Sequence, residues 1–389
     1  MTTAVASLRK LPVLRIALAG LVVLVLAFYF WSQSRYPSLN DKAMMSGTIQ
    51  LEDPLSFEAA VQFEPTAPLW KKIGYTTLNW IKTNRRGMTF GVLFGAAFLT
   101  LMRYLPRRSF RGSFANSALG LALGAPLGVC VNCAAPIAKG MFNSGARVET
   151  ALSAMVASPT LNIVVVAMAF SILPFYVAMT KLVLSLAVIL VGVPLVVRML
   201  PLAQRQMAFD VIPEASCAIP ATAARIEGPV SAVAGFAADF AKDFWYIVRM
   251  TVPLMLLAGF LGAVGANLLP LEMLKDMPIN PITLIAIAVV GVFLPVPIAF
   301  DVVIAATLLN AGLPISVVMV LVFTLGIFSV YSFMIVASSM SWRAAFLVSG
   351  LIVALAVIAG YGTDFYNAQM IDRSLDYLRS EGATSLFAT

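Results

Sequence analysis

Two thiols and an amide lie within four residues of one another, as Cys130, Asn132 and Cys133. Thiolates bind soft species such as trivalent arsenic or monovalent copper, and the Asn132 amide could hydrogen-bond an anion or an oxygen atom. Alternatively, both cysteines are packing residues, because a free cysteine behaves as a small buried hydrophobe. The three side chains are our first candidates for contact with a small soft solute.

The same cysteine spacing would also suit a redox pair or half of a zinc site. Zinc needs four ligands, whereas the chain has three cysteines and no histidine, and Cys217 stands alone in a polar segment. We therefore expect no metal site, no cofactor and no enzyme activity that depends on histidine. A membrane thiol–disulfide oxidoreductase using Cys130 and Cys133 stays an alternative, although one pair without a second pair is a poor relay.

The cysteines lie in residues 123–143, LGAPLGVCVNCAAPIAKGMFN, which are apolar enough to enter a bilayer. Helix breakers interrupt this stretch: Gly124, Pro126, Gly128 and Pro136. Broken backbone at membrane depth is tolerated only where it is buried in protein or lines a cavity. The stretch therefore predicts a membrane permease whose substrate path passes this loop.

A single acidic residue, Asp301, stands in the apolar sequence PVPIAFDVVIAA. A charge inside a membrane costs a few kcal/mol on insertion scales, so Asp301 is a functional-site hypothesis. It could carry a coupling proton or serve as the counter-charge for Lys139. Alternatively, it lies near the interface, where it snorkels or stays protonated. Lys139 itself and Arg147 are interpreted as cytoplasmic charges at the end of a loop.

Polar residues also interrupt two later apolar runs. Ser158, Pro159 and Asn162 break the helix that follows the cysteine stretch, and Ser329 and Tyr331 lie near the equivalent place in the second half of the chain. Hydroxyls, amides and freed carbonyls at these breaks could line the substrate path. Interhelical hydrogen bonding is the alternative role.

The composition is that of an all-α polytopic membrane protein. Hydrophobic residues make up 60% of the chain and charged residues 11%, far from the roughly 25% charge of an average soluble domain. The net charge of +8 comes from basic residues that flank apolar segments rather than from a basic domain, so we expect cytoplasmic anchoring and no nucleic-acid partner. Multiple passes through a bacterial inner membrane follow, with the N-terminus in the cytoplasm.

The pattern of apolar runs divides the chain into segments. In order, we expect an N-terminal transmembrane helix (1–31), an external segment with an interfacial helix (32–86), a first transmembrane repeat (87–198), a cytoplasmic linker (199–243), a second transmembrane repeat (244–362) and a polar C-terminal tail (363–389).

The two repeats are inferred from a shift of 167 residues, which places the breaks of one half on the breaks of the other. Asn310 then falls on Asn143, and Pro295 and Pro297 fall on Gly128 and Cys130. Identities are few, and chance similarity between apolar helices is the alternative. If it is real, the second half has its own hairpin around its two prolines.

Charge bias favours a re-entrant hairpin over a full span for the cysteine stretch, because a full span would leave Arg198 and Arg205 outside. Arms of about 15 residues, at about 1.5 Å per residue, reach a little past the midplane. The result is two inverted pseudo-symmetric repeats whose broken or re-entrant helices meet near the bilayer midplane, as is typical of secondary transporters.

The sequence GAPLGVCVNCAAPIAKGMFNSGA followed by ASPTLN resembles the predicted permease family that includes the organoarsenical efflux permeases. The resemblance is good over residues 120–166 and weaker over 291–333. It implies two pseudo-symmetric repeats, efflux across the inner membrane, and Cys130 and Cys133 as substrate contacts. The family often has its cysteines closer together, and the second half here has no cysteine but carries Pro297 and Asp301.

These observations predict an inner-membrane permease that exports a small soft or thiol-reactive solute such as a trivalent arsenical, with proton coupling at Asp301 as a hypothesis. Its partners would be a small-molecule or ion substrate and the lipid bilayer, with a homo-oligomer left open. A transporter of a small anion or sulfur compound and a non-transporting scaffold stay alternatives beside the oxidoreductase.

Overall fold

The computed structural model describes residues 12–35, 61–62, 67–104, 110, 112–143, 145–201, 228–268 and 280–386. Every regular element within these ranges is a helix. Most of the expected external segment 32–68, most of the linker with Cys217, and residues 387–389 lie outside the described part of the chain. An all-helical fold is therefore confirmed where the chain is described.

The first half of the chain contains a long helix pair, a broken stretch and a bent helix. Its elements are α1 (Val13–Phe30) with the π-turn η1 (Trp31–Arg35), α3 (Leu69–Tyr104), α4 (Ser113–Gly124), the 3₁₀ turn η2 (Ala125–Leu127), α5 (Val131–Asn143), α6 (Val148–Thr160), α7 (Ile163–Ile172), α8 (Phe175–Ala187), the π-turn η3 (Val188–Gly192) and α9 (Val193–Met199).

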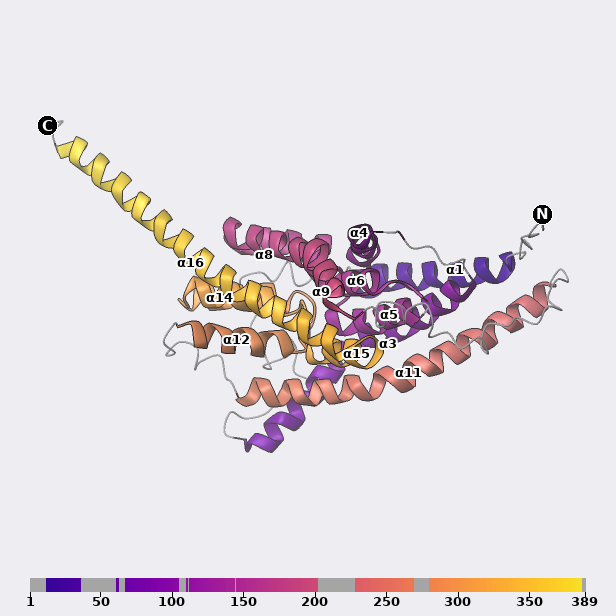
Figure 1. Cartoon of the computed structure of the whole chain (residues 1–389). Coiled ribbons are helices and arrows are strands. Elements are labelled where there is room, and N and C mark those ends of the chain that lie inside the picture. The colour runs from indigo at the N-terminus through magenta and orange to yellow at the C-terminus, as the bar shows by residue number, and fades with distance from the viewer. Residues whose placement is uncertain are drawn as a thin grey trace, which may run out of the picture.

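The second half also contains both long and short helices. Its elements are α11 (Pro229–Leu268), α12 (Pro281–Phe293), α13 (Phe300–Asn310), α14 (Ile315–Thr324), α15 (Val330–Ser339) and α16 (Trp342–Leu386). In Figure 1 the short helices α5, α6 and α15 lie in the middle of the bundle, whereas the start of α11 and the end of α16 extend beyond it at opposite ends.

Among the described residues, four helical stretches are long and apolar enough to cross a membrane, namely Val13–Gln33, Phe175–Met199, Pro229–Leu268 and Trp342–Ser374. A fifth is added if α6 and α7, which meet at a bend of 43°, form one broken span. Membrane-spanning helices are thus confirmed, and the shorter apolar helices α12 to α15, with 10 to 13 residues each, cannot cross a bilayer alone.

Several expected boundaries fall inside continuous helices. The expected interfacial segment and the expected first span of the first repeat lie in a single helix, α3, of 36 residues, which is not among the candidate spans. Residues 229–243 of the expected linker begin α11, and most of the expected C-terminal tail continues α16. At about 1.5 Å per residue, α3 is roughly 54 Å long, which exceeds a hydrocarbon core of about 30 Å. Polar residues at its ends can therefore remain helical outside the apolar layer.

One predicted helix breaker, Pro136, lies in a helix interior, whereas Pro159 comes just before a break. Pro136 lies inside α5, and Pro159 lies in the last turn of α6, with the break following at residues 161–162. Proline is tolerated in such helices because neighbouring helices can satisfy the carbonyl that loses its donor. The other predicted breakers do lie at helix ends: Gly124 ends α4, Pro126 lies in η2, and Gly128 has a left-handed φ of 57°.

Close helix packing holds α4 against α6. A Cβ at Gly120 would lie 2.4 Å from the Thr150 carbonyl oxygen of α6, and one at Gly124 would lie 2.4 Å from the Ala154 carbonyl oxygen. Small residues of this kind let helix backbones approach closely where lipid provides no hydrophobic drive. The α4 helix is therefore held on α6 by close backbone contact.

We predict that Gly124→Ala destabilises the protein by about 1–3 kcal/mol, because its Cβ must displace helix backbone rather than a flexible side chain. The matched control is Gly350→Ala in α16, where no atom lies within 4 Å of the new Cβ. There, alanine should be neutral or stabilising by up to about 1 kcal/mol. Unfolding of the two purified variants in detergent checks this, and equal stability would contradict the packing described.

Candidate functional site

The turn between α4 and α5 is stabilised by Ser158 of α6. The Val129 amide donates to Ser158 Oγ at 3.0 Å, and the Ser158 hydroxyl is 3.3 Å from the Val129 carbonyl oxygen. Gly128 is required at this turn, because its φ is positive and a Cβ there would lie 2.3 Å from the Asn162 side-chain nitrogen. Ser158 and Asn162, both predicted from sequence, are thus placed beside the hairpin turn.

Residues 128–133, which comprise the turn after α4 and the first residues of α5, are called the hairpin tip. They contact the break between α14 and α15, residues 325–329. The Ser329 hydroxyl donates to Asn132 Oδ1 at 2.9 Å, and the Ser332 hydroxyl lies 3.4 Å from the Val131 carbonyl oxygen. All these groups are buried. The structure therefore brings together Asn132 and Ser329, which are 197 residues apart in the chain.

Both predicted thiols are buried at this tip. Cys130 is 3% exposed and Cys133 is 0% exposed, and the Cys130 carbonyl accepts the first amide hydrogen bonds of α5. Tyr331 of α15 is also fully buried, with Thr251 and both cysteines as polar neighbours. Among the described residues, no group of three or more His, Cys, Asp or Glu side chains is arranged to hold a metal ion.

The second half has its own irregular segment, residues 294–299, between α12 and α13. Pro295 and Pro297 lie in this segment, and the buried Trp80 of α3 donates its indole N–H to the Pro295 carbonyl oxygen at 2.5 Å. Ala299 has a φ of 63°, which costs a residue with a Cβ roughly 1–2 kcal/mol. Strain of this kind persists only where the surroundings enforce it, and Asp301 follows two residues later.

Asp301 forms a buried ion pair with Lys181 of α8, and the Lys181 ammonium also donates to the Val322 carbonyl oxygen at 3.0 Å. The two side chains belong to residues that are 4% and 5% exposed. A Cβ at Gly326 would lie 3.7 Å from Asp301 Cγ. The 325–329 break therefore adjoins the ion pair through Gly326 and the hairpin tip through Ser329.

The pairing corrects two expectations. Asp301 is the counter-charge of Lys181, not of Lys139, and Lys139 is a buried residue of α5 with 1% exposure rather than a charge at a loop end. Sequence reasoning missed Lys181, although a lysine inside the apolar run 174–197 is itself a signal for a functional or paired intramembrane charge.

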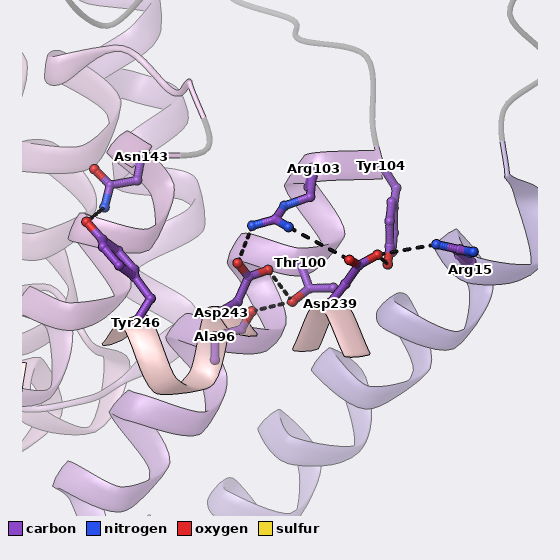
Figure 2. Close-up of polar contacts among 9 residues, drawn as sticks. All are labelled: Arg15, Ala96, Thr100, Arg103, Tyr104, Asn143, Asp239, Asp243 and Tyr246. Atoms are coloured by element: carbon purple, nitrogen blue, oxygen red, sulfur yellow. Dashed lines mark hydrogen bonds and ion pairs between the residues drawn. The ribbon is translucent and has the colours of Figure 1, made fainter. Parts of the chain in front are cut away.

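A second polar network ties α1 and α3 to the first half of α11 (Figure 2). Arg103 forms ion pairs with Asp243 and Asp239, and the Thr100 hydroxyl donates to Asp243 at 2.8 Å. The Tyr104 hydroxyl donates to Asp239 at 2.6 Å.

Figure 2 shows two further polar contacts of α11, one within this network and one beside it. Arg15 of α1 reaches Asp239 at 3.3 Å, and Asn143, the last residue of α5, donates to the Tyr246 hydroxyl of α11 at 3.1 Å. The first half of α11 thus contacts the N-terminal end of α1 and the C-terminal ends of α3 and α5. These contacts lie at the end of the bundle opposite to the end of α16 (Figure 1).

Comparisons with known proteins agree with a transport role. The model of the ArsP_1 family, described as a predicted permease, matches residues 96–365. The UPF0718 protein YraQ of Escherichia coli (strain K12) is 26% identical over 236 residues, which are 60% of this chain and 63% of YraQ. The chain thus matches less than two thirds of that relative's length. No solved structure matches the chain significantly.

We predict that Lys181→Met destabilises the protein by about 3–5 kcal/mol, because it leaves the Asp301 carboxylate buried without its partner. Replacing both residues, as Lys181→Met with Asp301→Leu, should recover most of this loss, since neither charge then remains. Denaturant or thermal unfolding of the single and double variants gives the coupling energy. Additive losses in the double variant would mean that the pair does not couple.

Proposed function

Because the chain belongs to the ArsP_1 family of predicted permeases, we propose that it is a secondary transporter of the bacterial inner membrane that exports a small solute. The observation that carries this proposal is the 325–329 break, which contacts the hairpin tip through Ser329 and adjoins Asp301 through Gly326. Buried irregular backbone from both halves of the chain meets there, as expected for a substrate path between broken helices.

We propose that the two halves are inverted repeats. The bounds of the elements support this, because adding 167 to the bounds of α7, 163–172, gives 330–339, the bounds of α15. The same shift carries the start of α8, Phe175, to the start of α16, Trp342. It also carries Gly145 to Gly312, and both glycines have a left-handed φ, of 93° and 79°.

The proposed orientation places the start of α11 and the ends of α1 and α3 that it holds on the cytoplasmic side. Arg15 and Arg103 lie at this end of the described bundle, which supports the assignment through the positive-inside rule. The α4–α5 hairpin would then enter from the cytoplasm, with its tip at Asn132.

The proposed substrate is a small soft or thiol-reactive solute, such as a trivalent arsenical, that contacts Cys130 and Cys133. Their position on both sides of Asn132 at the hairpin tip supports this assignment. One cysteine pair without a second pair is a poor relay, which argues against the thiol–disulfide oxidoreductase. A non-transporting scaffold would tolerate the loss of both thiols, which distinguishes it from the permease.

The proposed coupling element is the Lys181–Asp301 pair. A proton on Asp301 would neutralise the carboxylate and remove the attraction that holds Lys181 of the first half against α13 of the second half. Motion of one half relative to the other is the usual basis of alternating access in repeat transporters. The pair joins the two halves beside the 325–329 break, which supports this role.

We predict that Cys130→Ser combined with Cys133→Ser abolishes transport of methylarsenite into everted membrane vesicles while leaving the amount of folded protein unchanged. A thiolate coordinates trivalent arsenic, whereas a hydroxyl of similar size does not. The matched control is Cys217→Ser, which should transport as the wild type does. Undiminished transport by the double variant would refute the soft-solute assignment, and absence of transport by the wild type of any tested solute would refute the permease function.

We also predict that Lys181→Met combined with Asp301→Asn removes the dependence of transport on a pH gradient. The double variant carries no buried charge at this site, so it avoids the unpaired ion that a single substitution would leave. Exchange of substrate across vesicles without a gradient should persist. Proton-driven uptake that is unchanged in this variant would exclude the pair as the coupling element.

A further inference from the structure

Two buried donors on α5 lack an acceptor among the described residues. The Lys139 ammonium and the Asn132 side-chain nitrogen have no hydrogen-bond partner there, and the two residues are 1% and 0% exposed. The other end of the Asn132 amide is occupied, since Oδ1 accepts from Ser329. The nitrogen of Asn132 is therefore fixed in place as a donor with nothing to receive its hydrogens in the described part of the chain.

Helix geometry places these donors on one face of α5. Residues seven apart differ by about 20° around an α-helix and by about 10 Å along it. Side chains lean towards the helix N-terminus, so the lysine stem at 139 leans towards Asn132. Asn143, four residues further on, continues the same face and donates to Tyr246. This polar face of α5, defined by Asn132, Lys139 and Asn143, runs from the hairpin tip to the end of the helix.

A buried ammonium without a counter-charge is costly, because several kcal/mol of hydration are lost and nothing replaces them. Asp301, the acidic residue considered from sequence as its partner, is already paired with Lys181. An anionic ligand would supply the missing charge. An oxyanion also supplies several acceptor oxygens, which match the three hydrogens of the ammonium and the two of the amide.

We propose that the polar face of α5 binds a small oxyanion, with Lys139 as its counter-charge and the Asn132 amide as a hydrogen-bond donor. This inference rests on the proposed permease function and adds small oxyanions to its proposed substrate class. The anion would lie beside the hairpin tip, next to the thiols, so a soft centre and a charged oxygen could belong to one solute.

The test uses the purified full-length protein in detergent and two probes, thiosulfate and sulfate, each added at constant ionic strength. A ligand bound only by the folded state raises the melting temperature with the logarithm of its concentration. Sulfate also stabilises proteins non-specifically by exclusion from their surfaces. The signal is therefore the difference in shift between the wild type and Lys139→Met at the same salt concentration.

We expect at least one probe to give a larger shift for the wild type than for Lys139→Met. Lys139→Arg should keep most of the shift because it keeps the charge. Asn132→Leu, which keeps the ammonium but removes the amide, should raise the half-saturating concentration by about tenfold or more. Lys82→Met, the same substitution at an exposed lysine of α3, should respond as the wild type does.

Equal shifts for the wild type and Lys139→Met with both probes would overturn the inference and mean that Lys139 is held as a neutral amine. If Lys139→Met fails to fold, the shifts of Lys139→Arg and Asn132→Leu are compared instead. Equal shifts for these two variants and the wild type would then overturn the inference. Vesicle transport of methylarsenite distinguishes failure of the oxyanion site from failure of the permease function. If Lys139→Met transports methylarsenite normally and neither oxyanion is bound, the oxyanion site is refuted and the permease function is supported. If the wild-type protein transports no solute, both the permease function and the oxyanion site are refuted.

Discussion

The structure depends on one constraint. Each backbone N–H or C=O group that a helix break frees in an apolar interior needs a hydrogen-bond partner. The breaks described here meet it with side chains from distant segments. Ser158 satisfies Val129, Trp80 satisfies Pro295, and Lys181 satisfies Val322. Because each of these contacts joins segments that are far apart in the chain, the breaks depend on the assembled bundle. The irregular backbone at the centre is thus a consequence of the fold as a whole.

The same constraint explains which features could be predicted from sequence. A helix break that is caused by glycine or proline can be predicted from the local sequence. The turn at Gly128 and the irregular segment around Pro295 and Pro297 are breaks of this kind. The helical class followed from composition, because a chain with 60% hydrophobic residues that crosses a bilayer has few other options. Pro136 is the exception, because tertiary contacts can compensate for a proline inside a helix and the local sequence does not contain those contacts.

Long-range pairing was the part that sequence could not provide. Lys181 and Asp301 are 120 residues apart, and a single lysine hardly lowers the hydropathy of the run around it. Lys139 was misread because it stands five residues before Ser144, where a chain turn is expected, and a charge near a turn is usually solvated. In the fold, the helix that carries it is covered by α3, α6 and α15, which removes it from solvent.

The two buried lysines show why position relative to the breaks matters more than charge alone. Lys181 meets both an acid and a freed carbonyl, so its burial is compensated within the described structure. Lys139 lies inside α5, and its ammonium has neither an acid nor a carbonyl as a hydrogen-bond partner among the described residues. The carbonyl of Val322, near the end of α14, thus gives Lys181 a partner that Lys139 does not have. This difference fits the proposed roles, in which Lys181 holds the two halves together and Lys139 receives a ligand with the Asn132 amide.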